Sequence, residues 1–157
     1  MSKRCVGFVV SGDSVTMVDA SIPAEVDEAV TIVADDTWKL QKGERAEAYR
    51  VLHQRCADYV SENHIEKVVI KASAMPQSGG KLTLLQSAEV RGVIGAASAS
   101  VCNDVQFLAK GVISRTYGER KVDEYLNDDA FWDEVTEGGK LRKTSREAAM
   151  LLVATRA

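Results

Sequence analysis

The sequence has 157 residues, of which 45% are hydrophobic and 27% charged, which is typical of one globular domain. Twenty basic residues against 23 acidic ones give a net charge of −3, which excludes a global electrostatic attraction to nucleic acid and leaves only local patches. No apolar run reaches the ~20 residues of a membrane span, and three cysteines without a CxxC pair argue against a disulfide framework. We therefore expect a single domain over residues 1–157, located in the cytoplasm and without a membrane partner.

The first third of the sequence predicts three consecutive strands joined by hairpins. Residues 5–10 and 15–20 are short β-rich runs, and residues 11–14 between them have the turn chemistry of a hairpin. Pro23 ends the second run, and the β-branched residues of the segment 29–34 favour a third strand.

The period changes after Gly43. Apolar residues then recur every three or four positions as far as Asn63, which predicts an amphipathic helix. A strand at 65–70 follows, and a loop at 73–80 leads into a long helix over 81–98. A helix between two strands implies a crossover and parallel pairing of those strands.

The small residues Gly92 and Gly95 lie on one face of this long helix. Because glycine in a helix interior costs roughly 1 kcal/mol relative to alanine, we expect Gly92 to lie where the helix closely approaches another element. The long helix and the closing helix also carry more apolar side chains than one face of a sheet needs. This excess favours a homodimer.

The last third predicts one more strand at 105–109 and two helices, at 121–135 and 144–156. The complete order is βββ-α-β-α-β-α-α, which favours the α/β class with a mixed sheet of about five strands and helices on both faces. This is the element order of the RNase H-like fold.

The chain resembles the RuvC branch of that fold, the Holliday-junction resolvases and their relatives. Three segments carry the resemblance: the strand at 68–70 with the Gly-containing loop after it, the helix segment 84–97 with its Arg-Gly-Val core, and the Ala-rich closing segment 145–154. The resemblance covers most of the chain and implies an RNase H-like fold throughout.

The chemistry of that family needs acidic residues that converge on two divalent metal ions. The resemblance implies these acids in the middle of the first strand, at the end of the fourth strand and in the last helix. Those positions hold Val9, the pair Lys71-Ala72, and Glu147, so only one of them carries a carboxylate. We therefore expect no catalytic residue, no metal and no other cofactor, and an inactive domain that binds or assembles with nucleic acid or a protein partner.

The alternative is a nuclease that uses Mg²⁺ or Mn²⁺ with rearranged acids. The candidate catalytic residues are then Asp13, Asp19, Glu89 and Glu147. A turn and a strand end explain the first two without catalysis. Glu89 could pair with Arg91 or Lys81, and Glu147 could form a capping box with Thr144 at the start of the last helix.

The strongest basic segment lies directly before the closing helix, where free backbone amides also attract anions. The candidate nucleic-acid-binding residues are Arg115, Lys140, Arg142, Lys143 and Arg146. The alternative is a solvated basic segment that is neutralised by the acidic residues of the preceding stretch, 123–137.

Overall fold

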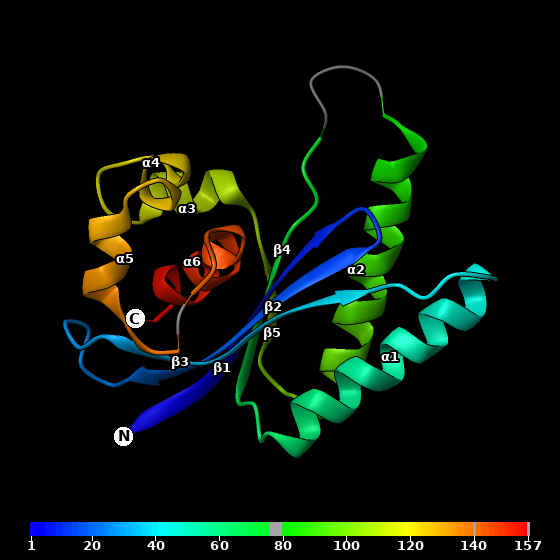
Figure 1. The fold of residues 1–157 in the computed structure, drawn as a ribbon, viewed down its shortest axis with the longest axis horizontal. Helices are drawn as coiled ribbons and strands as arrows, with labels where there is room; N and C mark the ends of the chain where they lie inside the picture. The colour runs from blue at the N-terminus through cyan, green and yellow to red at the C-terminus, as the bar shows by residue number, and fades with distance from the viewer. Residues whose placement is uncertain (76–79, 140, 157) are drawn as a thin grey trace.

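The computed structural model describes residues 1–75, 80–139 and 141–156 (Figure 1). Within these residues the strands are β1 (Ser2–Ser11), β2 (Ser14–Pro23), β3 (Val30–Lys39), β4 (Lys67–Lys71), β5 (Val105–Leu108) and β6 (Thr136–Gly138). The helices are α1 (Arg45–Glu62), α2 (Leu82–Val101), α3 (Lys110–Thr116), α4 (Val122–Leu126), α5 (Asp129–Val135) and α6 (Arg146–Ala154), with a 3-10 turn, η1 (Lys143–Ser145), before α6.

The strands form one mixed sheet in the order β5-β4-β1-β2-β3-β6. The β1, β2 and β3 strands are an antiparallel meander, and β4 and β5 continue it in parallel on the β1 side, as the sequence predicts. The expected five strands become six among the described residues, because Thr136–Gly138 pairs in parallel with the start of β3. Three residues are too few to show a strand period in the sequence.

Helices cover both faces of the sheet, as expected (Figure 1). The α1 and α2 helices pack on one face over a core that includes Phe8, Met17 and Trp38. The opposite face carries α6, around which α3, α4 and α5 lie. The sheet thus separates two hydrophobic cores.

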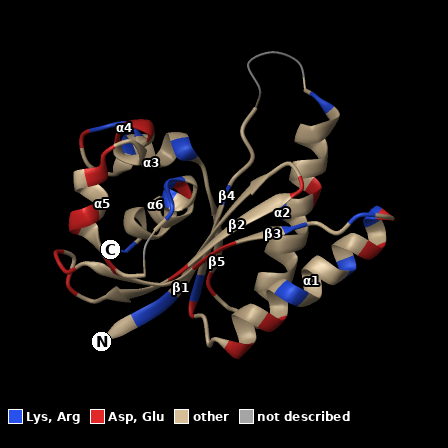
Figure 2. Cartoon of the chain, viewed as in Figure 1, with Lys and Arg blue, Asp and Glu red and all other residues tan. Residues whose placement is uncertain are grey.

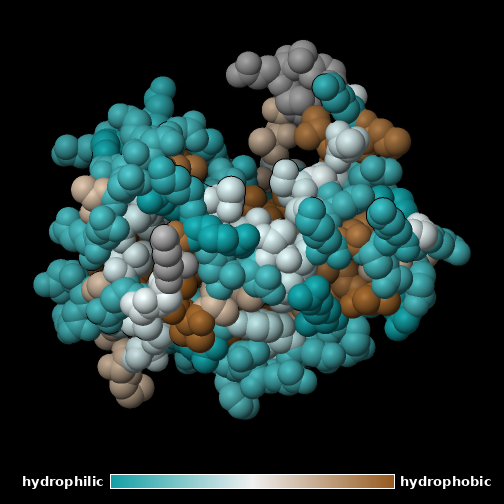
Figure 3. Space-filling view, in the orientation of Figure 1, coloured by the Kyte–Doolittle hydropathy of each residue, from teal (hydrophilic) through white to brown (hydrophobic). Residues whose placement is uncertain are grey.

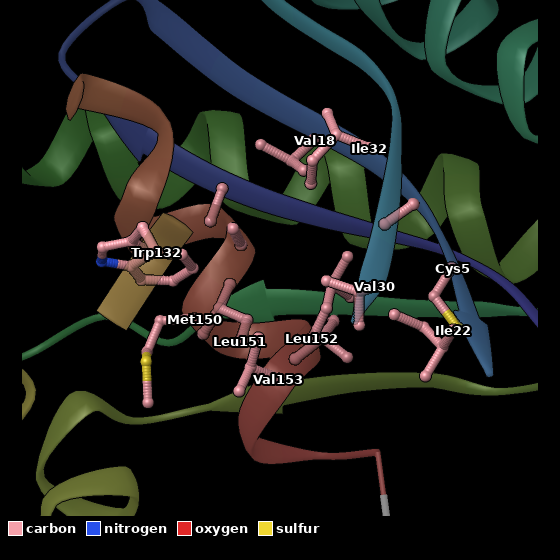
Figure 4. Packing of buried hydrophobic residues seen from close by; sticks show 14 of the residues in the cluster. Cys5, Val18, Ile22, Val30, Ile32, Trp132, Met150, Leu151, Leu152 and Val153 are labelled. Atoms are coloured by element: carbon pink, nitrogen blue, oxygen red, sulfur yellow. The ribbon is translucent and has the colours of Figure 1, made fainter. Parts of the chain in front are cut away.

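The α6 helix is the centre of the second core (Figure 4). Its residues from Ala148 to Val153 are all buried, which requires α6 to lie directly against the sheet. Gly7 of β1 makes this approach possible, because a Cβ atom at this position would collide with the backbone oxygen of Ala148. The absence of a side chain at Gly7 therefore sets the distance between α6 and β1.

Three expectations about the helices are wrong. The helix predicted over 121–135 is interrupted at Asn127, and the Asp128 carboxylate caps α5 by accepting a hydrogen bond from the backbone N–H of Phe131 (3.1 Å). Gly92 is exposed and faces open space, whereas a Cβ atom at Gly95 would lie 2.7 Å from the Phe107 ring. The close approach therefore occurs one turn later than expected. The capping box at Thr144 is also absent, because Glu147 bonds to Lys71.

The three cysteines, Cys5, Cys56 and Cys102, are buried and unpaired. Burial raises the pKa of the Cys5 and Cys56 thiols to about 11, so both are neutral at physiological pH. None of the described helices is both long enough and apolar enough to cross a membrane.

Candidate functional site

The positions singled out by the resemblance meet at one end of the sheet. Because β1 and β4 are parallel neighbours with Phe8 opposite Ile70, the next residues, Val9 and Lys71, lie side by side where β4 ends. The crossing of α6 over Gly7 brings Glu147, the residue before Ala148, above the same place. The sequence expectation that these three positions converge is therefore correct.

A hollow of about 440 Å³ opens at this point. Its lining combines the end of β1, the end of β4, one side of α2 and the start of α6. The residues that matter for its chemistry are Val9, Lys71, Ser87, Arg91 and Glu147.

An ion pair occupies the place where the resemblance implies a cluster of carboxylates. The Lys71 Nζ atom donates a hydrogen bond to Glu147 Oε1 at 3.0 Å, and the two side chains are 24% and 22% exposed. Val9 offers no oxygen and Lys71 repels cations, so these residues do not fit a pair of divalent metal ions. In the part of the chain that the structure describes, no group of three or more His, Cys, Asp or Glu side chains could hold a metal.

The α2 helix forms the wall of the hollow through two polar side chains one turn apart. The Ser87 Oγ atom accepts a hydrogen bond from the Gly12 N–H (3.0 Å) and donates one to the Thr83 carbonyl (2.8 Å). Arg91 donates to the Val10 carbonyl (3.3 Å) and to Ser73 Oγ (2.9 Å). These bonds hold α2 against the end of β1 and fix the position of the Arg91 guanidinium.

Sequence reasoning missed Arg91 and Ser87 as site residues. Their spacing of four residues places them on one face of the long helix, which the sequence does indicate. What it does not indicate is that this face lies against the β1–β2 turn, where Gly12 adopts a positive φ of 58°.

The four acidic candidates lie in separate places. Glu147 lies in the hollow, while Asp19 lies on the opposite face of the sheet, where it bonds to α1. Asp13 is in the β1–β2 turn, 3.5 Å from Arg45. Glu89 accepts a hydrogen bond from the Tyr49 hydroxyl (2.6 Å), so the expected pairing of Glu89 with Arg91 or Lys81 is wrong.

Asp19 is fully buried in β2, and its carboxylate accepts hydrogen bonds from two residues. Arg4 donates two hydrogen bonds to its carboxylate, at 2.8 and 2.6 Å, and the Tyr59 hydroxyl donates a third at 2.6 Å. Burial and the neighbouring carboxylate raise the pKa of Tyr59, which keeps its hydroxyl protonated as a donor. This network joins β1, β2 and α1 on the face of the sheet opposite α6.

The basic candidates before α6 lie among acidic residues (Figure 2). Arg142 forms an ion pair with Asp35 at 2.8 Å, and Arg146 forms one with Asp129 at 2.8 Å. Lys143 lies 3.9 Å from Asp129, and Arg115 is exposed in the last turn of α3. Lys140 lies outside the described residues. The role of this set in binding nucleic acid stays a prediction.

Asp35 anchors the segment before α6 to β3, and this anchor should depend on pH. Burial alone would raise the pKa of Asp35, but hydrogen bonds from the Arg142 side chain, Ser145 and the Arg142 backbone outweigh it and lower the pKa. A carboxyl group with a lowered folded-state pKa stabilises the protein above its unfolded-state value of about 3.9. That contribution is lost as the pH falls through the folded-state value.

We therefore expect the free energy of unfolding of the wild type to fall more than that of Asp35→Asn between about pH 5 and pH 2. Urea unfolding followed by circular dichroism at a series of pH values measures this difference. Arg142→Ala should also flatten the profile, because it removes the main donor. Parallel profiles for the wild type and Asp35→Asn would contradict the assignment.

The antiparallel meander, the two parallel strands beside β1 and the helices on both faces define the RNase H-like fold, and comparison with solved structures assigns its RuvC-like form. RuvC from Thermus thermophilus superposes with a TM-score of 0.67 and 10% identity over 96% of this chain and 92% of that chain. T. thermophilus RuvC in complex with a Holliday junction substrate gives a TM-score of 0.68 and 11% identity over 96% and 91%. The yeast mitochondrial Holliday junction resolvase Ydc2 gives 0.58 and 10% over 98% and 78%.

No protein-family model matches the sequence, and no curated protein matches it. At 10–11% identity the likeness to RuvC concerns the fold. The RNase H-like, RuvC-like fold expected from the sequence is confirmed.

Proposed function

We propose that this protein is a catalytically inactive RuvC-like domain that binds nucleic acid without cutting it by a metal-dependent reaction. The observation that carries the proposal is the Lys71–Glu147 ion pair at 3.0 Å, located where β1, β4 and α6 meet. A fold related to that of RuvC bound to a Holliday junction supports nucleic acid as the partner.

The charge at this place opposes metal binding. Two divalent ions bring about four positive charges and need several carboxylate oxygens each. Here the single carboxylate of Glu147 is already neutralised by Lys71, and Arg91 adds a second cation to the same hollow. Any Mg²⁺ that entered would be repelled by both cations.

The test is a cleavage assay with the purified full chain and Mg²⁺ or Mn²⁺ on branched, duplex and single-stranded DNA and RNA. We expect no cleavage of any substrate, together with binding that weakens steeply as the salt concentration rises, because phosphate contacts release counterions. Cleavage that disappears in Glu147→Gln would overturn the proposal and favour the alternative, a nuclease with rearranged acids. Binding that is absent at low salt would also overturn it.

The homodimer stays a prediction. The apolar side chains of α6 from Ala148 to Val153 are buried in the core, so they are not available to contact a second copy of the protein. The start of α2 instead exposes hydrophobic side chains (Figure 3), namely Leu82, Leu84 and Leu85.

A further inference from the structure

We propose that the hollow between β1, β4, α2 and α6 binds a phosphate group of a nucleic-acid strand, with Lys71 and Arg91 as its cationic ligands. This inference deepens the proposed function and rests on it for the source of the phosphate. The hollow would thus take an anion at the place where the resemblance implies metal cations.

The charges that line the hollow favour an anion. Lys71 and Arg91 contribute two positive charges and Glu147 contributes one negative charge, which leaves a net charge of +1. A lysine ammonium group has three donors, and Glu147 takes one of them. Lys71 can therefore donate to a phosphate oxygen while its ion pair with Glu147 holds it in place.

Arg91 is held in position before any ligand arrives. Its terminal nitrogens donate to Val10 and Ser73, and its Nε–H is buried without a partner among the described residues. Burial lowers the pKa of the guanidinium, but an arginine stays charged at physiological pH. A guanidinium has five N–H donors, and Val10 and Ser73 take only one from each terminal nitrogen, so the second N–H of each terminal nitrogen is left for a phosphate oxygen in the hollow.

The size of the hollow suits a nucleotide. Its volume of about 440 Å³ falls within the roughly 300–1,000 Å³ that is usual for small-molecule sites. Thr83 and Leu84 in the first turn of α2 form part of the wall. The Leu84 N–H already donates to the Lys81 carbonyl at 2.9 Å, so of these two residues the Thr83 N–H is the first-turn amide that adds to the attraction of Lys71 and Arg91.

Two binding measurements test the inference on the full chain. The first follows fluorescence anisotropy of a labelled single strand, with a 5′-phosphate or a 5′-hydroxyl end, to separate a terminal phosphate from an internal one. The second follows amide and Arg91 Nε–H resonances by NMR on addition of inorganic phosphate or thymidine monophosphate. The matched controls are Lys42→Ala and Arg50→Ala, which remove the same charges at exposed positions outside the hollow.

We expect Lys71→Met and Arg91→Ala each to weaken binding of the oligonucleotide about tenfold, the effect of losing one charge-assisted hydrogen bond. The affinities of the two controls should stay within about twofold of the wild-type affinity, since salt screens exposed charges that lie outside the site. Glu147→Gln should bind about threefold tighter, because it removes the negative charge nearest the phosphate. A structural role for Glu147 alone would not produce this gain.

Equal affinities for Lys71→Met, Arg91→Ala and the two controls would overturn the inference, as would weaker binding by Glu147→Gln. If the protein binds the oligonucleotide but the resonances of Gly12 and Arg91 in the hollow do not shift, the phosphate site is refuted and the proposed function stands. Shifts with thymidine monophosphate in a protein that binds no oligonucleotide would support the phosphate site and refute the proposed function. Because the NMR arm uses the wild type, it does not depend on the folding of any variant.

Discussion

Replacing Gly7 by alanine should destabilise the protein by about 3 kcal/mol. The added methyl group would collide with the backbone oxygen of Ala148, and a backbone atom cannot rotate away as a side chain can. The α6 helix would have to move off β1, which opens the core around Met150 and Leu151. Glu147 would move with it, so the ion pair to Lys71 should weaken as well.

The control for this prediction is the same substitution at Gly92. Gly92 is exposed in the middle of α2 with nothing near its missing side chain, so alanine meets no obstacle there. Gly92→Ala should stabilise the protein by up to about 1 kcal/mol, because alanine has the higher helix propensity. Unfolding by guanidinium chloride measures the change in the free energy of unfolding for both variants. A Gly7→Ala protein as stable as the wild type would refute the close contact of α6 with β1.

Replacing Asp19 by alanine should cost about 3 kcal/mol of stability, in the absence of any metal. Asp19 is fully buried, and its removal leaves the Arg4 guanidinium and the Tyr59 hydroxyl without their acceptor. The Arg4 side chain is 29% exposed, so water can partly replace the lost hydrogen bonds. The loss of stability therefore lies at the lower end of the range for breaking a buried ion pair.

Asp13 provides the comparison, because the sequence made both residues candidate metal ligands. Its side chain is 58% exposed and lies 3.5 Å from Arg45, so Asp13→Ala should change stability by less than about 0.5 kcal/mol. A double-mutant cycle with Arg4→Ala and Asp19→Ala should show coupling, since the two residues share hydrogen bonds. Additive effects of the two substitutions would mean that the network contributes no stability of its own.

The element order could be predicted because its signals are local. The strands of the meander, α1 and α2 each show their period within a short stretch of sequence, and the β-α-β crossovers then favour parallel pairing. The interruption at Asn127 was hidden because apolar residues continue at helical spacing through 122–135. The pairing of β6 with β3 joins residues more than one hundred positions apart, and no local pattern signals it.

The sequence by itself determined the class of fold and the identity of the residues at the three positions that the resemblance singles out. That Val9 and Lys71 carry no carboxylate needs no structure, because strand positions follow from the β period. The tertiary structure alone decided that Lys71 pairs with Glu147, that Arg91 enters the same hollow and that Asp19 is buried on the other face. These facts depend on which helix covers which face of the sheet and how closely it approaches. Gly7 permits that approach for α6, and its role becomes visible only when Ala148, far away in the sequence, lies against it.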